Sequence, residues 1–386
     1  MKVKLAFTAP FIVGGIKQVS NYIESIDYIP GNVVRAAFAR YILSRCAYHD
    51  PDEIIEVDNL PRKNWVYFKD EPGCNECRLK NICQKFSDME FSFFYPEGAE
   101  IIPMTMMICK MNPQHGLIDR LIEKPECTKC EGGKGRVESV SGYLKEGERY
   151  SVVKSFVTKT AIDSYTGTAK DGSLYSLVAV SATVTSEDSN SDSDKNVFIG
   201  EIKGVQEQDL LSIDDLRIGK YTSVGFGRCN ILPQPEEETT DRKQIVERLQ
   251  HFNRLYKEHN EIDDDNNYFA IKFVSDARLD FEMSDVNEYV TTEEYKKMWS
   301  KALGLSSEFE IERVYAESFN FRGYDTSKVG EDKREEPIHI VEKGSVILYK
   351  TQLDFERIAD YFSSVKGFGL DLKDGFGHID YHFGGV

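Results

Sequence analysis

The feature that most constrains this chain is a glycine-rich segment that occurs twice, 150 residues apart. Residues 219–228 read GKYTSVGFGR, and residues 369–378 read GLDLKDGFGH. Both follow the pattern G-x5-G-F-G and end in an arginine or a histidine. Each copy follows a helix-like stretch and precedes a strand-like one, 229–232 and 379–383. The agreement favours duplication of one folding unit over coincidence.

These segments allow two interpretations. Glycine permits positive φ angles and close approach of a ligand to the backbone. Successive backbone N–H groups can then form a concave anion site, and an RNA phosphate is the natural anion for it. The alternative is that the glycines only make a tight turn between a helix and a strand.

The rest of the chain fits an α+β protein of two domains, which its 386 residues can accommodate. A strand is expected at 2–9, and the same kind of pattern restarts at Tyr268. We predict a first domain over 1–235, an acidic linker and helix over 236–267, and a second domain over 268–386. Other expected elements are strands at 174–184, 197–202 and 225–231 and helices at 211–216 and 244–256.

The segment Tyr28-Ile29-Pro30-Gly31-Asn32 predicts the start of a helix. Asn32 is a good N-cap residue, because its side chain can accept a hydrogen bond from a free backbone N–H group. Apolar residues follow at helical spacing from Val33 to Ile42. We therefore expect Arg35 one turn inside this helix.

Cysteine spacing predicts metal binding in an irregular insertion at about 61–135. Cys74-x2-Cys77-x5-Cys83 forms one group, and Cys127-x2-Cys130, with Cys109 and His115 before it in the sequence, forms another. Four Cys or His ligands suit a closed structural zinc site. The first group lacks an obvious fourth ligand and could recruit one from elsewhere in the chain or share a site with the second. An iron–sulfur cluster and free thiols are the alternatives. Cys46 and Cys229 are expected to be buried apolar residues.

Composition limits the function. The formal net charge of −17 argues against bulk, nonspecific nucleic-acid binding, which depends on lysine and arginine. Much of the acid lies in stretches expected to be solvated loops, namely 187–194, 236–241, 258–265 and 331–342, so a local basic groove remains compatible with the sequence. No apolar run is long enough for a membrane span, and the N-terminus does not read as a signal peptide. We expect a cytoplasmic protein.

Several motifs in order resemble the RAMP superfamily of CRISPR-associated proteins. Residues 29–37, IPGNVVRAA, resemble the family's entry to its first helix, with Asn32 for serine and Ala36 for glycine. Residues 162–176, IDSYTGTAKDGSLYS, resemble its hairpin, and Gly344-Ser345-Val346 resembles a turn of its second domain. The two glycine-rich segments match the loop that ends each family domain. Two such domains with a cysteine insertion look most like the double-RAMP subunit of type III-D effector complexes.

The resemblance implies two ferredoxin-like, RRM-like domains, with the metal-stapled insertion in the first. It also implies that Cys109 and His115 complete the ligand set of Cys127 and Cys130, since the family shows a Cys and then a His-Gly there. It implies a structural subunit that binds guide RNA (crRNA), packs against other RAMP subunits and the large subunit, and meets target RNA indirectly. The residues that it assigns to RNA are Asn32, Arg35, Lys159, Lys170, Gly219, Lys220, Gly225, Gly227, Arg228, Gly369, Gly375, Gly377 and His378. Arg35 could instead be a solvated helix residue, and Tyr165 and Tyr175 could either stack on bases or pack.

Catalysis is the main alternative, since some RAMP proteins cut RNA. Asp27 stands just before the first helix, and His49 is expected at its end. General acid–base cleavage needs a group within hydrogen-bond reach of the 2′-hydroxyl, and spacing does not place one there. We therefore predict no catalytic residue and keep an endoribonuclease as the second hypothesis. A zinc-stapled scaffold for proteins, without RNA contact, is the third.

Overall fold

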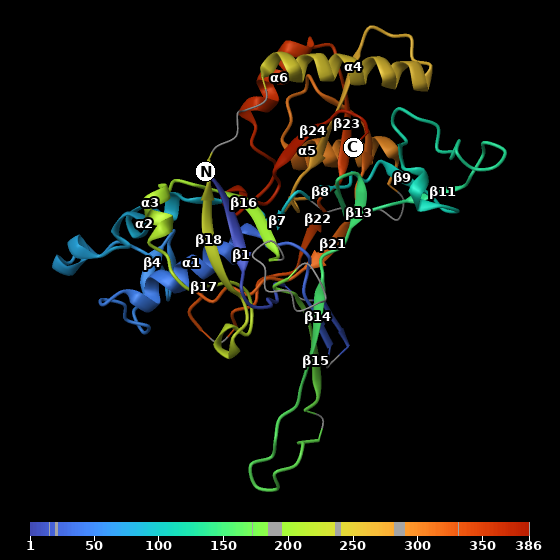
Figure 1. Cartoon of the computed structure of the whole chain (residues 1–386). Helices are drawn as coiled ribbons and strands as arrows, with labels where there is room; N and C mark the ends of the chain where they lie inside the picture. Colours follow the sequence, from blue (N-terminus) through green and yellow to red (C-terminus); the bar gives the residue numbers. More distant parts are fainter. Residues whose placement is uncertain are drawn as a thin grey trace.

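Two antiparallel sheets organise the computed structural model, one drawn from each half of the chain (Figure 1). The structure describes the whole chain except residues 15, 20–21, 172, 184–194, 236–240, 282–289, 331 and 386, and it omits the side chains of 16–19. Within the described residues, no helix is both long and apolar enough to cross a bilayer.

The first sheet has the spatial order β17-β18-β1-β16-β6, and all its neighbouring strands are antiparallel. Its main elements follow one another along the chain as strand, helix, strand, strand, helix, strand: β1 (Lys2–Phe7), α1 (Gly31–Arg45), β6 (Glu90–Phe91), β16 (Val197–Lys203), α3 (Glu207–Leu211) and β18 (Arg228–Gln234). The short strand β17 (Leu216–Arg217) extends one edge, and β7 (Tyr95–Pro96) also pairs with β16.

The second sheet repeats this arrangement in the order β20-β23-β19-β24. The same series of element types appears along the chain: β19 (Asn267–Phe273), α5 (Thr292–Leu303), β20 (Glu310–Tyr315), β23 (Val346–Thr351), α6 (Phe355–Ser364) and β24 (Ile379–His382). In both sheets the first of the four strands lies between the third strand and the fourth: β1 lies between β16 and β18, and β19 lies between β23 and β24. The two halves therefore share one connectivity.

Several expected elements are confirmed, and two are wrong. The strands expected at 2–9 and from Tyr268 are β1 and β19, and the helix expected at 244–256 is α4 (Arg242–Asn260). The helix expected at 211–216 instead lies at α3, because Leu216 already pairs with Cys229 in the sheet. The strand expected from Gly225 begins only at Arg228, since the preceding glycines form the turn. The acidic stretch 187–194 lies outside the described residues.

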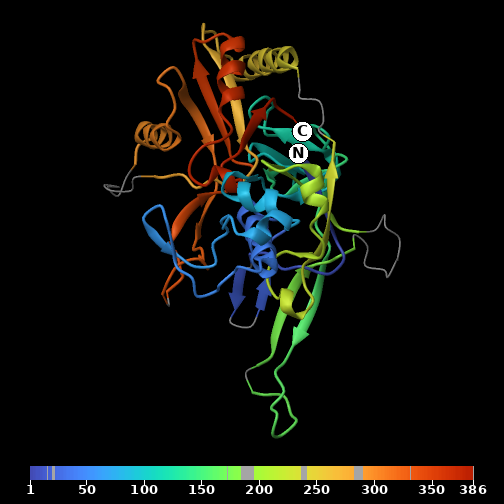
Figure 2. The same cartoon turned by 90° about the vertical axis from the view of Figure 1, so that its left-hand side faces the viewer.

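Smaller units project from this frame (Figures 1 and 2). The hairpin of β14 (Lys154–Lys159) and β15 (Tyr175–Val180) extends far from both sheets, and it joins β3 (Tyr22–Glu24) and β2 (Ile16–Val19) at its base. The other small elements are β4 (Ile55–Val57), β5 (Leu60–Arg62), η1 (Pro72–Glu76), α2 (Lys80–Lys85), η2 (Phe86–Asp88), β8 (Glu100–Ile101), β9 (Met106–Cys109), η3 (Pro113–His115), β10 (Leu117–Asp119), β11 (Val137–Ser139), β12 (Tyr143–Lys145), β13 (Glu148–Tyr150), η5 (Thr222–Val224), β21 (Ser318–Phe321), β22 (Ile338–Val341) and η6 (Leu372–Asp374).

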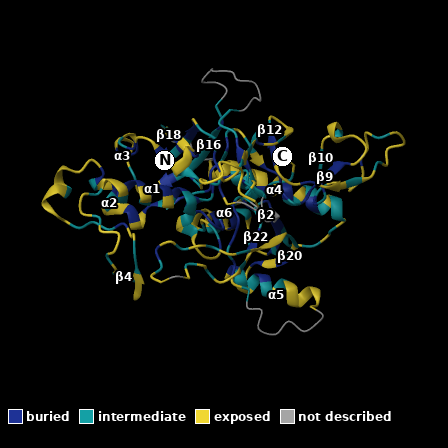
Figure 3. Ribbon diagram, turned by 90° about the horizontal axis from the view of Figure 1, so that it is seen from below, coloured by how far each residue is buried: buried dark blue, intermediate teal, exposed yellow. Residues whose placement is uncertain are grey.

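Each sheet has its own apolar core. Val3, Leu5 and Phe7 are fully buried on β1, as their alternation predicts, and pack with Val34 and Phe38 of α1. The second core gathers Phe269, Phe273 and Tyr349 against α5 and α6. Buried residues fill the middle of the molecule, and exposed residues gather on the projecting segments (Figure 3).

The two halves are joined through specific contacts. The Tyr28 hydroxyl donates a hydrogen bond to Asp276 Oδ2 at 2.5 Å, and the Tyr95 hydroxyl donates to the carbonyl of Val274 at 2.6 Å. Arg35 of α1 pairs with Asp374 of η6. These contacts fix how the glycine segments of the two halves sit relative to α1.

Candidate functional site

The first glycine loop (Gly219–Arg228) and the second glycine loop (Gly369–His378) share one backbone geometry. In each, a residue with positive φ opens a single 3₁₀ turn, and a glycine with positive φ ends it. Equivalent backbone amides of the two loops donate hydrogen bonds to equivalent carbonyls. In the first loop, Gly227 donates to Pro10 at 2.8 Å, Lys220 to Ile12 at 2.8 Å and Ile218 to Gly227 at 2.9 Å. In the second loop, Gly377 donates to Asp276 at 2.8 Å, Leu370 to Arg278 at 2.9 Å and Phe368 to Gly377 at 2.9 Å.

Packing explains some of the glycines without any ligand. A Cβ on Gly227 would overlap the carbonyl of Ile218, and one on Gly377 would overlap that of Phe368. Gly219 and Gly369 are likewise closed in by backbone carbonyls. The tight-turn interpretation therefore accounts for these four positions.

The remaining glycine of each loop, Gly225 in the first and Gly375 in the second, lies in different surroundings. A Cβ on Gly225 would meet nothing within 4 Å, and Ser223, Val224 and Gly225 are exposed. Gly375 is buried, because its Cα faces the backbone of Phe91 and Ser92 in the first half. This differs from the expectation that both loops present backbone to RNA. Only the first loop has an open tip.

The start of α1 is occupied by the second loop. Helix α1 begins at Gly31 with Pro30 as its N-cap, so the expected N-cap role of Asn32 is wrong. Gly31 lies against the carbonyls of Phe91 and Asp374, where no side chain would fit. Asn32 is the second helical residue, and its buried Oδ1 has no hydrogen-bond partner among the residues that the structure describes.

Arg35 is neither solvated nor free for RNA. Its guanidinium pairs with Asp374 and donates hydrogen bonds to the carbonyls of Phe86 (3.2 Å) and Met89 (2.6 Å). The same group lies over the Phe91 ring, 4.9 Å from its centroid. The arginine thus fastens the second glycine loop to the first half.

A groove of about 1250 Å³ opens between the two halves and runs to the first glycine loop. Asn32, Gly219 and Lys220 line it, so it joins residues that the sequence assigned to RNA from two distant segments. Further lining residues carry charge or aromatic rings: Glu24, Asp27, Tyr28, Arg40, Tyr143, Lys154, Asp276, Phe319, Arg322, Tyr324, Glu342 and Lys343.

The cations of the groove differ in how far protein partners engage them. Lys154 Nζ lies 2.6 Å from Glu24 Oε1 and 2.7 Å from Asp27 Oδ1, and Lys343 Nζ lies over the ring of Tyr28. Lys220 pairs with no carboxylate in the described part of the chain. Burial lowers the pKa of its ammonium, which is the cost of holding an uncompensated cation at the groove.

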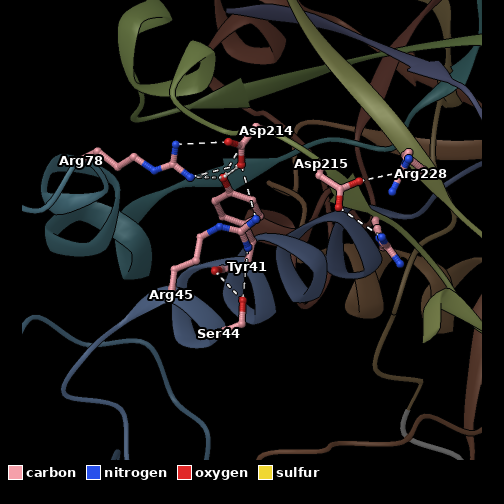
Figure 4. Close-up of polar contacts among 8 residues, drawn as sticks. Tyr41, Ser44, Arg45, Arg78, Asp214, Asp215 and Arg228 are labelled. Atoms are coloured by element: carbon pink, nitrogen blue, oxygen red, sulfur yellow. Dashed lines mark hydrogen bonds and ion pairs between the residues drawn. The ribbon is translucent and has the colours of Figure 1, made fainter. Parts of the chain in front are cut away.

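Other sequence-assigned residues lie around the first loop. Arg228 is paired with Asp215 at 2.7 Å (Figure 4). Lys159 Nζ lies 5.1 Å from the centroid of the Phe226 ring, which places the base of the projecting hairpin over this loop. Lys170 is exposed near the far end of the hairpin, close in sequence to Tyr165, whose side chain is 98% exposed.

His378 of the second loop is half-buried. Its Nε2 is 3.1 Å from the carbonyl of Leu372, and burial lowers the pKa of the imidazole. The neutral ring is therefore favoured, which removes the charge that a phosphate contact would use.

The structure brings Cys109, His115, Cys127 and Cys130 together as the sequence predicted, with all four ligand atoms within 4.8 Å of one another. Cys109 lies at the end of β9 and His115 in η3, whereas Cys127 and Cys130 lie in the segment between β10 and β11. His115 Nδ1 lies 3.2 Å from Cys127 Sγ, and the sulfurs of Cys109 and Cys130 are 3.4 Å apart. This set could bind a metal ion.

The electrostatics of the set suit a cation. The Asn112 amide donates to Cys109 Sγ and lowers the pKa of that thiol to about 6. The pKa of Cys130 is raised to about 12, chiefly by its contact with Cys109. Two sulfurs this close cannot both be thiolates without a positive charge between them, and a divalent ion supplies that charge.

The other predicted metal residues do not join this set. Cys74, Cys77 and Cys83 lie on η1 and α2, beside the C-terminal end of α1. Tyr41, Arg45 and Arg78 converge on Asp214 there (Figure 4). One site shared by the two cysteine groups, which was one of the two possibilities for the first group, does not fit this arrangement.

Comparisons with known proteins give matches among solved structures but not among protein families or curated sequences. No protein-family model and no curated protein matches the sequence. Among solved structures, "Cryo-EM structure of the Type III-B Cmr-beta bound to cognate target RNA and AMPPnP, state 1" has a TM-score of 0.43 and 12% identity. The structure of the same assembly bound to cognate target RNA has a TM-score of 0.42 and 11% identity. Each match covers 95% of this chain and 89% of the other. Scores this low leave the function to be argued from motifs and geometry.

Sequence reasoning missed Arg40, Lys154 and Lys343 of the groove. Each is a single lysine or arginine without a motif around it, and the groove exists only once the two halves are joined. The alternation of the strands and the spacing of the cysteines carry no information about that junction.

Proposed function

We propose that this chain is a guide-RNA-binding structural subunit of a type III CRISPR ribonucleoprotein effector complex. The ordered motifs support membership of the RAMP superfamily. The repeated strand–helix–strand–strand–helix–strand series supports two ferredoxin-like domains, over 1–235 and 268–386, joined by the segment 236–267. Other RAMP subunits and the large subunit of the complex are its proposed protein partners, and the type III-D form is its proposed subtype.

The observation that carries the proposal is the open tip of the first glycine loop beside the groove. Gly219 and Lys220 of the first glycine loop line a channel with charged and aromatic walls, and Lys220 pairs with no carboxylate among the described residues. Ser223, Val224 and Gly225 of the same loop are exposed. Backbone amides and one cation suit a phosphate, and aromatic rings suit an unstacked base. A single strand of RNA, rather than a duplex, fits such a surface.

The net charge of −17 limits how many phosphates can be bound. Most cations of the groove already have a protein partner, so affinity should depend on few phosphate contacts and fall only moderately with salt. This distinguishes the proposed binding from a general attraction to nucleic acid.

The test is binding of labelled single-stranded guide RNA to the full chain. Lys220→Glu and Gly225→Asp each place negative charge where a phosphate would lie and should weaken binding by about tenfold or more. Lys243→Glu is the matched control, because Lys243 is an exposed lysine of α4 that does not line the groove. Equal affinity of all four proteins would refute the RNA interface.

The same RNA tests the ribonuclease alternative. Asp27 lies in the groove with its carboxylate held by Lys154, whereas His49 lies near the end of α1 and does not line that groove. If Asp27 were a general base, cleavage would occur with the wild type and disappear with Asp27→Ala. Intact RNA with both proteins supports the non-catalytic role.

We further propose that the ion at Cys109, His115, Cys127 and Cys130 is a structural zinc. Three sulfurs and one imidazole nitrogen fill a tetrahedral shell and leave no position for a water molecule. Zinc would then stabilise an insertion whose strands are only three or four residues long in β9, β10 and β11.

A further inference from the structure

Two arginines from different elements converge on the turn of the first glycine loop. Arg40 of α1 donates hydrogen bonds to the Thr222 hydroxyl at 3.1 Å and to the carbonyl of Arg217 at 2.6 Å. Arg217 of β17 donates to the carbonyl of Thr222 at 2.9 Å. Both guanidinium groups therefore lie within hydrogen-bond distance of one threonine, directly before the exposed tip of the loop.

The two arginines differ in how far carboxylates neutralise them. Arg217 lies 3.2 Å from Asp215, which also pairs with Arg228 at 2.7 Å (Figure 4). Arg40 pairs with no carboxylate among the residues that the structure describes. Burial and the charge of Arg217 lower the pKa of the Arg40 guanidinium, although the group remains ionised. The fold therefore holds two like charges close together, and Arg40 has no counter-charge in the described part of the chain.

Positive charge surrounds the first glycine loop. Five cations contact the loop or belong to it: Lys159, Lys220, Arg40, Arg217 and Arg228. Within the described residues, Asp215 is the one carboxylate that pairs with any of them. Such a surplus on a chain with a net charge of −17 indicates an anionic ligand at this place.

The second glycine loop shows what the first one lacks. Its turn carries two aspartates, and each pairs with an arginine: Asp371 with Arg278, and Asp374 with Arg35. The first loop, residues 219–228, contains no aspartate or glutamate. The arginines beside the first loop therefore receive no carboxylate from it, and an anion from outside the chain can take that place.

We propose that Arg40, Arg217 and the Thr222 hydroxyl form a phosphate-binding site at the first glycine loop. This rests on the proposed RNA-binding function and adds a contact that the glycine pattern did not indicate. Guanidinium groups bind phosphate oxygens through paired N–H donors. The Thr222 hydroxyl accepts its bond from Arg40, so its own proton is available to a phosphate oxygen. Arg40 and Lys220 both line the groove, so one RNA strand meets both.

The competing explanation is that Arg40 only fastens the loop to α1. Glutamine at this position separates the two explanations, because its amide can still donate a hydrogen bond but carries no charge. Arg40→Lys is the complementary variant, since it keeps the charge but not the paired donors. A phosphate contact predicts that the lysine variant retains more RNA affinity than the glutamine variant.

The first measurement is binding of labelled single-stranded RNA to the full chain at several salt concentrations. Arg40→Gln should weaken binding by about tenfold or more. It should also reduce the slope of log Kd against log salt by about 0.7, because one phosphate contact is lost. Arg357→Gln is the matched control, since Arg357 is an exposed arginine of α6 that does not line the groove. Wild-type affinity of Arg40→Gln, or a loss of affinity with an unchanged slope, would overturn the proposal.

The second measurement needs no variant and no RNA, so it depends neither on folding of the mutants nor on the proposed function. Wild type is treated with an arginine-specific dicarbonyl reagent in inorganic phosphate, or in chloride at the same ionic strength. Peptide mass then gives the modification rate of each arginine. Phosphate should slow the modification of Arg40 and leave that of Arg357 unchanged. Equal rates for Arg40 in the two anions would exclude the phosphate site.

Two RNAs of one sequence, with a 5′-hydroxyl or a 5′-phosphate, distinguish the sources of the phosphate. Equal affinity assigns the site to the RNA backbone, whereas tighter binding of the phosphorylated RNA that Arg40→Gln abolishes assigns it to the RNA end. If Lys220→Glu weakens RNA binding but Arg40→Gln does not, the RNA interface stands and this site is refuted. If the wild type binds no RNA, the proposed function fails, and protection by inorganic phosphate alone decides the site.

Discussion

At the scale of single residues, the glycines that occupy equivalent positions in the two loops differ in their surroundings. Gly225 and Gly375 end the same turn with φ angles of +99° and +80°. Open space surrounds the first, and the backbone of the other half encloses the second. A positive φ makes any side chain unfavourable at both, but only at Gly375 would a side chain also separate packed segments.

We therefore predict unequal effects of the same substitution. Gly375→Asp should lower the free energy of unfolding by at least about 2 kcal/mol, since it adds overlap to backbone strain. Gly225→Asp should cost about 1 kcal/mol from strain alone. Chemical denaturation of both variants and the wild type checks this. Equal losses would mean that the second loop is not packed as described.

A second prediction at this scale concerns Asp214. Hydrogen bonds from Tyr41 and Arg78 lower the pKa of its carboxyl to about 2, below the ordinary value of 3.8. The folded state therefore favours the ionised form, and the stabilisation is present above about pH 4 and is lost as the pH falls toward 2. The difference in unfolding temperature between wild type and Asp214→Asn should shrink over that range. A difference that is constant with pH would contradict it.

At the scale of elements, the insertion that carries the Cys109 set is connected to the second half by a buried pair. His382 Nε2 of β24 lies 2.6 Å from Asp119 Oδ2 of β10, and 3.2 Å from the hydroxyl of Thr105. The side chains of His382 and Asp119 are 3% and 0% exposed. The insertion therefore contributes to the core beneath α4, where Leu121 packs with Phe252 and Tyr256.

Removal of the metal should therefore loosen the insertion first. We predict that Cys127→Ser, or a chelator, increases backbone amide exchange in β9, β10 and β11, since their few strand pairs cannot hold the segment alone. Exchange in β1 and β16, which belong to the first core, should not change. Hydrogen–deuterium exchange with mass spectrometry reads both, and uniform protection after metal removal would refute a structural role.

The sequence could predict elements whose cause is local. Alternation identified β1 through Val3, Leu5 and Phe7. Cysteine spacing identified the pair Cys127 and Cys130, and the family resemblance added Cys109 and His115. It could not predict that Pro30 rather than Asn32 caps α1, because Gly31 is enclosed by Phe91 and Asp374 from distant segments.

At the scale of the whole molecule, contacts between charged and aromatic side chains join the two halves. Arg35 and Asp374 are 20% and 26% exposed, so their pair is only partly screened by solvent. Phe93 meets Phe376 edge to face at 5.0 Å between centroids, and Tyr28 bonds to Asp276 beside them. The groove depends on this junction.

We predict strong coupling across the junction. Arg35→Ala should lower the free energy of unfolding by about 2–3 kcal/mol, since it leaves Asp374 and two carbonyls without their donor. Asp374→Ala should add little on top of it, giving a coupling energy of about 1–3 kcal/mol in a double-mutant cycle. The four proteins of the cycle, compared by denaturant unfolding, provide the measurement. Strict additivity would mean that the pair does not link the halves.

The ion pair between Arg35 and Asp374 also has a consequence for biosynthesis. The two residues are separated by 339 positions, so a ribosome adding about 5–20 residues per second reaches Asp374 roughly 17–70 s after Arg35. Throughout that interval η6 does not yet cover the beginning of α1. The nascent first half must therefore avoid aggregation while this surface of α1 is exposed to solvent. The start of α1 is thus covered by residues that are synthesised more than 300 positions later.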